Sequence, residues 1–285
     1  MIDFHSLDSI GFDTLFETFS MAFAEYEVQP NKEELQKMLY RRGFLPELSF
    51  GAFDNGRLVS FTCNGIGAFG GVKTAYDTGT GTIKEYRGQG LASSVFSKSI
   101  PYLKSAGVCQ YLLEVLQHNT GAVSVYRKQG FVTTREFNYF VSPMESLTPN
   151  NRKLPVGFAL NEISLADLQT VSAWFDFEPS WQNSFDAIRR KPDDFIVIGV
   201  CRGDVLVGYG ILEPTTGDIT QIAVDPNCRR MGVGSNILNE ILNRNSYSSI
   251  KLINSDVECT SIVEFLNKFG LSVTGKQFEM IKKLV

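Results

Sequence analysis

The chain contains one internal repeat that extends over most of its 285 residues, and this repeat restricts the possible folds more than any other feature. Three pairs of segments match in the same order: 48–61 with 195–210 at an offset of 148, 85–94 with 228–238 at an offset of 142, and 126–131 with 266–271 at an offset of 140. Ordered matches whose offsets drift slowly indicate duplication of one domain, with changes in loop length.

The length agrees with this interpretation, because single domains cluster near 100 to 150 residues. The stretch "VSPMESLTPNNRKLP" is polar and contains three prolines, which is typical of a connection between domains. We therefore predict a first domain over residues 1–142, a linker over 143–155 and a second domain over 156–285.

Each copy has the same predicted order: helical segments, a β-hairpin, a strand, a glycine-rich loop, a helix, a strand, a helix and a final strand. In the first copy Asp-Asn-Gly supplies the hairpin turn. Asn31, followed three residues later by Glu34, is a capping-box pattern that predicts the start of a helix. The apolar periodicity predicts further helices over 91–105 and 119–129.

Composition excludes several classes of protein. A net charge of −4 and a pI near 5.4 disfavour nucleic-acid binding. The five cysteines are scattered without C-x-x-C pairs, so neither a disulfide framework nor a metal site is expected. Acidic residues near the amino terminus and the lack of a long apolar run argue against a signal peptide and a membrane span, so we expect a cytoplasmic protein.

The glycine loop "EYRGQGLASS" points to anion binding. A loop that follows a strand and opens a helix leaves backbone N–H groups without intrahelical partners, and the helix dipole favours an anion there. Gly88 and Gly90 let the backbone come close to a phosphate, and Arg87 adds a positive charge. A turn that serves only chain reversal remains an alternative for one loop, but its occurrence in both copies favours binding.

A dinucleotide-binding fold is a second alternative, because "GQGLAS" begins like G-x-G-x-x-G and Glu114 lies where a ribose-binding acid could be. The third glycine position is Ser93 in the first copy and Ile237 in the second. In both copies the loop also follows a hairpin instead of opening the domain. The order of elements therefore disfavours this fold.

The loop resembles the signature of the GNAT superfamily of N-acetyltransferases, which is Arg or Gln, two residues, Gly, one residue, and Gly or Ala. Arg87, Gly90 and Ala92 match it. "NTGAVSVYRKQGF" is similar to the last helix of the family, with Asn119 as its N-cap and Tyr126 seven residues later. The resemblance implies two tandem α/β domains, each with a mixed, mostly antiparallel central sheet flanked by helices.

The resemblance also implies acetyl-CoA as co-substrate, with no metal. The residues expected to bind it are Thr82, Ile83, Arg87, Gly88, Gln89, Gly90, Leu91, Ala92, Ser93 and Asn119. In the family, the loop holds the pyrophosphate and the preceding strand offers backbone groups to the pantetheine arm.

Acetyl transfer to an amine needs a base for the amine and an acid for the departing thiolate. The resemblance places Tyr126 beside the thioester sulfur, where it would act as the acid. Asp77 and Glu114, on the strands before and after the loop, are the candidate bases. The second copy has Leu266 at the tyrosine position and Cys259 at the asparagine position, so we expect it to be degenerate or regulatory.

The expected acceptor is a primary amine of a small molecule or a peptide, with no nucleic acid or membrane as partner. Glu25, Glu27 and Trp181 could line a site for a cationic or aromatic group of the acceptor. Two other functions stay open at this point: a non-enzymatic sensor or interaction module that binds acetyl-CoA, and the same fold with a different acyl donor.

Overall fold

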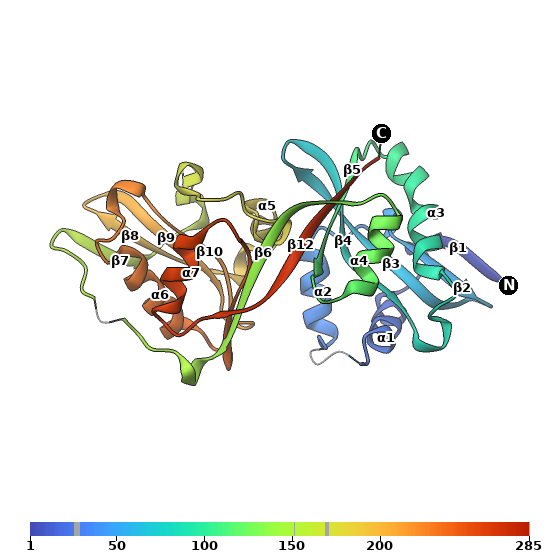
Figure 1. Ribbon diagram of the computed structural model, residues 1–285, viewed down its shortest axis with the longest axis horizontal. Helices are drawn as coiled ribbons and strands as arrows, with labels where there is room; N and C mark the ends of the chain where they lie inside the picture. Colours follow the sequence, from blue (N-terminus) through green and yellow to red (C-terminus); the bar gives the residue numbers. More distant parts are fainter. Residues whose placement is uncertain (26–28, 151, 169–170, 285) are drawn as a thin grey trace. The chain divides into compact units, whose positions relative to one another are not determined.

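The computed structural model describes residues 1–25, 29–150, 152–168 and 171–284. The chain divides into two compact units (Figure 1). Unit 1 comprises Met1–Thr134 and Phe278–Val285, and unit 2 comprises Arg135–Gln277.

Unit 1 is a mixed sheet flanked by helices. Its elements are β1 (Ile2–Ser6), α1 (Phe12–Ala22), α2 (Lys32–Arg41), β2 (Phe50–Asp54), β3 (Arg57–Phe69), β4 (Val72–Thr82), α3 (Leu91–Ser105), β5 (Gln110–Leu116) and α4 (Thr120–Lys128). Two further strands, β6 (Val132–Pro143) and β12 (Val273–Lys283), contribute residues to both units. The strand order in unit 1 is β1-β2-β3-β4-β5-β12, antiparallel from β1 to β4 and parallel between β4 and β5.

Local sequence signals account for several of these elements. In the hairpin turn, Asn55 and Gly56 have φ values of 49° and 82°, the left-handed pair that a two-residue hairpin loop requires. Asn31 and Glu34 form both bonds of the capping box at the start of α2. The helix predicted over 91–105 is α3, and the helix predicted over 119–129 is α4 with Asn119 as its N-cap.

Unit 2 repeats the sheet but not all of the helices. Its elements are β7 (Phe158–Glu162), α5 (Phe185–Arg189), β8 (Ile196–Arg202), β9 (Val205–Glu213), β10 (Asp218–Val224), α6 (Val233–Arg244), β11 (Ser249–Asp256) and α7 (Thr260–Asn267). The strand order is β7-β8-β9-β10-β11-β6. The two-domain α/β architecture with a mostly antiparallel mixed sheet in each copy is thus confirmed.

The helical segments expected before the second hairpin are reduced. The described part of this stretch contains 3-10 turns and the five-residue helix α5. Residues 169–170 lie outside the described ranges. Pro179 and the Ser and Asn residues near it interrupt the apolar pattern, because these residue types favour turns and caps over helix interiors.

The compact units differ from the sequence repeats in their last strands. The end of β12 belongs to unit 1, where Phe278, Met280 and Leu284 pack into the core beneath α3 and α4. The Leu284 N–H donates to the Cys109 carbonyl at 2.8 Å. Residues 135–143 of β6 belong to unit 2, where Phe140 is part of the core. Each unit is therefore completed by the final strand of the other copy, unlike the predicted domains 1–142 and 156–285.

The predicted linker is also built into unit 2. Pro143 ends β6, and a 3-10 turn follows over Met144–Ser146. Met144, Leu147 and Leu154 pack against the core of unit 2. These apolar side chains explain why the segment is held against the unit and is not only a spacer.

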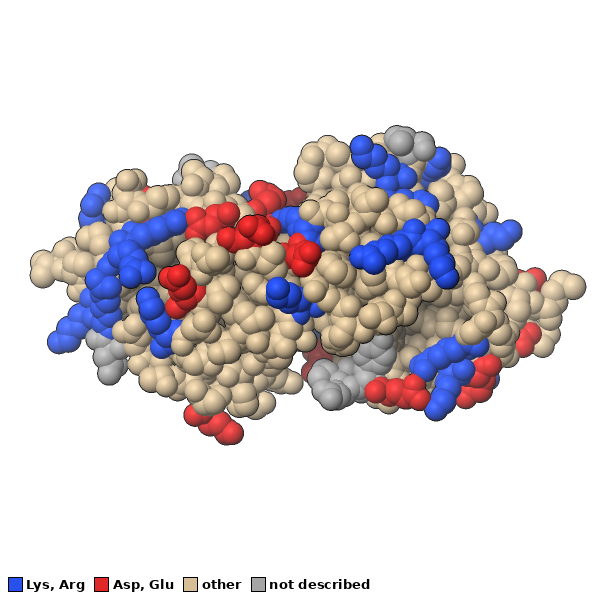
Figure 2. Space-filling view, viewed as in Figure 1, with Lys and Arg blue, Asp and Glu red and all other residues tan. Residues whose placement is uncertain are grey.

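The surface carries both signs of charge. On the face shown in Figure 2, lysine and arginine side chains form short groups, and some of these groups lie beside acidic side chains. Within the described ranges, no helix has the length and apolar character that a membrane span requires.

Because the end of β12 packs in the core of unit 1, a mutation there in the second copy should act on unit 1. Met280→Ala removes a side chain buried in unit 1 and should destabilise that unit by about 2–5 kcal/mol. Hydrogen exchange should therefore become faster in α3, β5 and α4. The matched control is Leu271→Ala, which removes a buried side chain from the core of unit 2 and should affect unit 2 instead. The same pattern of faster exchange from both variants would contradict the exchange of strands.

Candidate active site

The site in unit 1 begins where two parallel strands stop pairing. β4 and β5 pair through Thr74–Gln110, Ala75–Tyr111 and Tyr76–Leu112. Asp77 is the first residue of β4 beyond the last of these pairs. Opposite it, the ladder between β3 and β4 is irregular, because Cys63 pairs with Gly79 while Asn64 pairs with Asp77. This bulge redirects the β4 side chains at the opening.

The Asp77 carboxylate accepts hydrogen bonds from its own strand. The Thr80 hydroxyl lies 3.0 Å from Oδ1 and 2.9 Å from Oδ2, and the Gly79 N–H donates to Oδ1 at 3.0 Å. Burial raises the pKa of Asp77 to about 6, although the bonds from Thr80, Gly79 and Tyr126 and the charge of Arg42 oppose the rise. Near neutral pH, Asp77 is therefore mostly ionised but binds a proton far more readily than an ordinary aspartate.

Tyr126 contacts the same carboxylate. Asn119 caps α4 by accepting a bond from the Ala122 N–H at 3.2 Å, and Gly130, with φ of 89°, ends the helix. The helix places the Tyr126 ring against Phe131 and its hydroxyl 3.4 Å from Asp77 Oδ2. The structure thus brings together two of the three predicted catalytic residues, from segments 49 positions apart.

Glu114, the third candidate, has a different partner. It lies on β5 and accepts a hydrogen bond from the Tyr76 hydroxyl at 3.0 Å. Burial, and then the Glu114 charge, raise the pKa of the Tyr76 phenol. Tyr76 is almost fully buried. Glu114 therefore has its hydrogen-bond partner inside the unit, whereas Asp77 contacts Tyr126.

The glycine loop has the geometry expected of an anion-binding loop. Gly88 and Gly90 have φ values of 77° and 74°, a conformation that a Cβ atom disfavours. A Cβ at either position would meet no atom within 4 Å, so backbone conformation and not packing requires glycine. Gly90 is the N-cap of α3 and makes no side-chain cap bond, which leaves the first turn open to a ligand. Gln89 is exposed, Leu91 is buried, and Ala92 and Ser93 are half-buried at this helix start.

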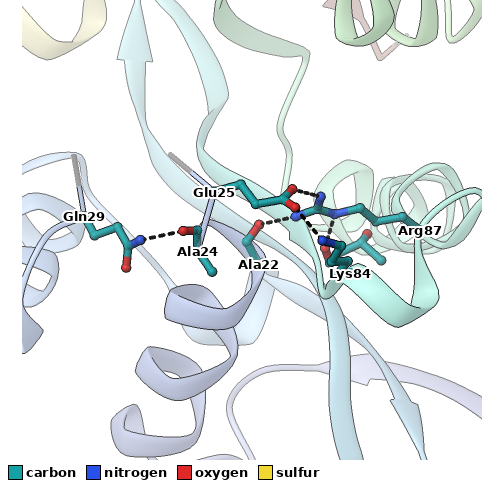
Figure 3. A network of polar contacts seen from close by, with 7 residues as sticks. Ala22, Ala24, Glu25, Gln29, Lys84 and Arg87 are labelled. Carbon is teal, nitrogen blue, oxygen red and sulfur yellow. Dashed lines mark hydrogen bonds and ion pairs between the residues drawn. The ribbon is translucent and has the colours of Figure 1, made fainter. Parts of the chain in front are cut away.

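Arg87 is engaged with three groups of unit 1 (Figure 3). Its Nε donates to the Thr82 carbonyl at 3.2 Å and its NH2 to the Ala22 carbonyl at 2.9 Å. Its NH1 forms an ion pair with Glu25 at 2.6 Å. Lys84 and Arg87 together lower the pKa of Glu25 to about 2. Arg87 therefore joins the end of α1 to the glycine loop, a structural task that the sequence motif does not reveal.

The hydrogen-bond and ion-pair partners of the other predicted residues lie within unit 1. The Ile83 N–H donates to the Val59 carbonyl and the Ile83 carbonyl accepts from the Tyr86 N–H, each at 3.0 Å, so both backbone groups are engaged. The Thr82 hydroxyl bonds Ser60 at 2.7 Å. Glu25 is paired with Lys84 and Arg87, and Glu27 lies outside the described residues.

Sequence reasoning missed two residues that shape the site, Thr80 and Arg42. The hydrogen bond from Thr80 could have been predicted from the sequence, because a hydroxyl three residues after an aspartate often bonds its carboxylate in a turn or bulge. Arg42 donates to the Thr78 carbonyl at 3.2 Å and lowers the pKa of Asp77. It comes from the end of α2, and nothing in the local sequence relates it to β4.

Comparison with known proteins assigns the chain to a family. The model of the acetyltransferase (GNAT) family matches residues 12–131 and 161–246, and the chain belongs to this family. Both copies are covered, which agrees with the repeat. The family match and the repeat thus agree on two tandem GNAT-type domains.

Two relatives match part of the chain. N-alpha-acetyltransferase 30 of Schizosaccharomyces pombe is 32% identical over 99 residues, which are 34% of this chain and 66% of that protein. N-alpha-acetyltransferase MAK3 of Arabidopsis thaliana is 28% identical over 102 residues, which are 35% of this chain and 54% of that protein. The chain spans less than two thirds of the length of either relative.

Solved structures show the same fold over the whole chain. A tandem GNAT protein from the clavulanic acid biosynthesis pathway matches with a TM-score of 0.77 and 12% identity, covering 100% of this chain and 99% of that one. A GCN5-related N-acetyltransferase from Sphaerobacter thermophilus matches with a TM-score of 0.71 and 14% identity, covering 99% and 96%.

The raised pKa of Asp77 predicts a pH-dependent stability. A carboxyl whose pKa rises from 3.8 to about 6 on folding is protonated more easily in the folded state. Its favourable contribution is complete below pH 3.8 and is lost as the pH rises through 6. The advantage of Asp77→Asn over the wild type should therefore grow as the pH rises from about 3.8 to about 6, and should level off at ~3 kcal/mol.

Urea unfolding at several pH values measures this difference. Ser9→Ala, at an exposed position without a titratable side chain, is the control and should show a constant difference from the wild type. A constant difference for Asp77→Asn as well would contradict the raised pKa.

Proposed function

We propose that unit 1 transfers the acetyl group of acetyl-CoA directly to a primary amine, without a covalent enzyme intermediate. The observation that carries this proposal is the contact between Tyr126 and Asp77 at the opening between β4 and β5. Tyr126 would be the acid and Asp77 the base of one hydrogen-bonded pair, and a loop suited to a diphosphate follows the same β4 strand. This arrangement supplies the proton transfers that amide formation needs.

The glycine loop and the first turn of α3 would hold the diphosphate of acetyl-CoA, which brings the acetyl thioester. Residues 87–93 would supply backbone N–H groups and the open space above Gly88 and Gly90. Thr82 and Asn119 would contact the pantetheine arm, while Ile83 would support the strand, since its backbone groups bond Val59 and Tyr86.

Asp77 and Tyr126 together would move one proton from the amine to the thiolate sulfur. Asp77 would accept the proton that the amine loses, and Tyr126 would donate its proton to the departing thiolate sulfur. Tyr126 would then recover a proton from Asp77 across their 3.4 Å contact. Glu114 would act as a positioning residue, because it holds the Tyr76 hydroxyl.

We propose an α-amino group of a peptide or protein as the first acceptor class to test. The two relatives are named N-alpha-acetyltransferases. The pKa of Asp77, about 6, is nearer to that of an α-amine, about 7.7–8, than to that of a lysine amine, about 10.4. Proton transfer to Asp77 is therefore easier from an α-amine.

Removal of the Tyr126 hydroxyl tests the acid. Tyr126→Phe should lower kcat by about 10²- to 10⁴-fold with unchanged affinity for acetyl-CoA, because the thiolate loses its proton donor. Steady-state kinetics and calorimetry measure the two quantities. Tyr102→Phe, at an exposed tyrosine of α3, is the control and should behave as the wild type. Full activity in Tyr126→Phe would remove Tyr126 from the mechanism.

The pH profile tests the base. Below pH 6 the wild-type kcat/KM should fall about tenfold per pH unit, because Asp77 becomes protonated. Asp77→Asn should be slower near pH 7.5, by roughly 10²-fold, and should lack this acid limb. An unchanged acid limb in Asp77→Asn would assign the base to another group.

Two peptides of one sequence decide the acceptor class. One has a free α-amine and an acetylated lysine, and the other has an acetylated α-amine and a free lysine. Acetyl transfer to the first should predominate. Preference for the second would overturn the α-amine assignment. Acetyl-CoA binding without transfer to peptides or small amines would favour a sensor over an enzyme.

A further inference from the structure

A β-bulge brings Asp77 and Thr80 to one face of β4, although they are three residues apart. In a regular strand, side chains at this spacing point to opposite faces of the sheet. Here the strand partners of Thr80 and Gly79 are consecutive residues of β3, whereas the next pair on β4 skips Thr78 and joins Asp77. Thr78 is therefore the extra residue that changes the alternation of side chains between Asp77 and Thr80.

Two hydrogen bonds hold the bulge in this shape. The Thr78 hydroxyl donates to the Cys63 carbonyl at 2.9 Å, and the Thr78 carbonyl accepts from Arg42 at 3.2 Å. Thr78 is buried, so water competes little for either bond. The backbone of β4 therefore fixes the positions of Asp77 and Thr80, in addition to the bonds between their side chains.

The Thr80 hydroxyl has one proton and three acceptors within hydrogen-bond distance. Asp77 Oδ1 and Oδ2 lie 3.0 and 2.9 Å from the Thr80 oxygen. The Thr62 hydroxyl oxygen, on the adjacent strand β3, lies 3.2 Å from it. A threonine hydroxyl has a single O–H, which rotates to suit its acceptor. The Thr80 proton therefore has two alternative directions, toward the carboxylate and toward Thr62.

Thr62 is well placed to accept this proton. It pairs directly with Thr80 across β3 and β4, so the two side chains are on the same face of the sheet. Thr62 is fully buried, and among the described residues its hydroxyl is bonded by Thr80. Because a buried polar group is costly to leave unbonded, this contact stabilises the strand pair whenever Thr80 turns toward it.

The two carboxylate oxygens of Asp77 have different partners. Oδ1 accepts from the Gly79 N–H at 3.0 Å, and such a bond favours negative charge over a proton on that oxygen. Oδ2 contacts the Thr80 hydroxyl at 2.9 Å and the Tyr126 hydroxyl at 3.4 Å. A hydroxyl oxygen accepts a hydrogen bond as well as it donates one. A proton taken up by Asp77 therefore belongs on Oδ2.

The other titratable groups that interact with Asp77 come from every element around it. They are Cys63 on β3, Tyr76 on β4, Tyr111 on β5, Arg42 at the end of α2 and Tyr126 on α4. Burial is the first cause that raises the pKa values of the thiol and of the Tyr76 and Tyr111 phenols, so these stay neutral near pH 6. Arg42 keeps its positive charge. Glu114 on β5 accepts its bond from Tyr76. The Thr80 hydroxyl therefore responds to the protonation of Asp77 itself.

We propose that Thr80 and Thr62 are positioning residues that let Asp77 hold and release a proton. While Asp77 is ionised, the Thr80 hydroxyl donates to the carboxylate. When Oδ2 takes up a proton, the new O–H donates to the Thr80 oxygen, and the Thr80 hydroxyl turns to donate to Thr62. Both states of Asp77 are then hydrogen-bonded, and no covalent bond of either threonine changes. This proposal rests on the proposed function, in which Asp77 is the base.

Two substitutions that keep the side-chain shape separate the two directions. Thr80→Val removes the donor of the ionised state, so the pKa of Asp77 should rise by about one pH unit. Thr62→Val removes the acceptor that the protonated state needs and leaves Thr80 on the carboxylate, so this pKa should fall by roughly half a pH unit. The carbon NMR signal of the isotopically labelled Asp77 carboxyl, assigned with Asp77→Asn, measures both changes in the full chain.

Three control variants distinguish this exchange from packing. Thr80→Ser and Thr62→Ser keep the hydroxyl groups and should titrate as the wild type does. Thr74→Val removes another buried hydroxyl of β4, which bonds Val72 and Gln110, and should leave the titration of Asp77 unchanged. A role in packing alone predicts no opposite changes in Thr80→Val and Thr62→Val.

Kinetics then relates the hydrogen bonds to acetyl transfer. The acid limb of kcat/KM should move to higher pH in Thr80→Val and to lower pH in Thr62→Val, by the same amounts as the NMR titration. The KM for acetyl-CoA should stay unchanged, since neither threonine belongs to the glycine loop.

An unchanged pKa of Asp77 in Thr62→Val, or a rise in both valine variants, would overturn the role of the threonine pair, and Asp77 would remain the candidate base. Failure of the proposed function gives a different result. In that case the NMR titrations change in opposite directions while the acid limb stays in place, which supports the threonine pair and removes Asp77 as the base of the transfer.

Discussion

The end of pairing between β4 and β5 is the constraint on which the rest of the site depends. Three residue pairs join the strands, and beyond them the backbone of each strand faces an opening instead of a neighbour. Asp77 is at the narrow end of this opening, and α4 brings Tyr126 to it from the other strand. The glycine loop follows the same β4 strand, so one divergence of strands positions both this loop and the contact between Asp77 and Tyr126.

Much of this arrangement could be predicted from sequence, because it depends on local signals. The capping box at Asn31, the limits of α3 and the cap of α4 by Asn119 follow from residues close together in the chain. The repeat and the loop motif predicted the tandem fold and its family, and both are confirmed. The partners of Arg87, the approach of Arg42 and the contact between Asp77 and Tyr126 depend on tertiary packing between distant segments, for which no local pattern exists.

The two copies differ at the candidate catalytic tyrosine position, and both have the same kind of arginine contacts. Arg87 and Arg229 each tie the segment before the hairpin to the glycine loop, through two carbonyl groups and one acid. The same connection is present in unit 2, where the described part of the segment before the hairpin has 3-10 turns and the short helix α5. These arginine contacts do not require the tyrosine, since Leu266 stands at the corresponding position in the second copy.

The exchange of final strands also affects the order in which the protein is completed during synthesis. A chain folds as it leaves the ribosome, and an N-terminal domain ordinarily finishes first. Here the core of unit 1 includes Met280 and Leu284, which are made after all of unit 2. Unit 1 therefore begins first and is completed last. Until then, β5 presents an open edge and an apolar surface, and both features make an incompletely folded chain prone to aggregation.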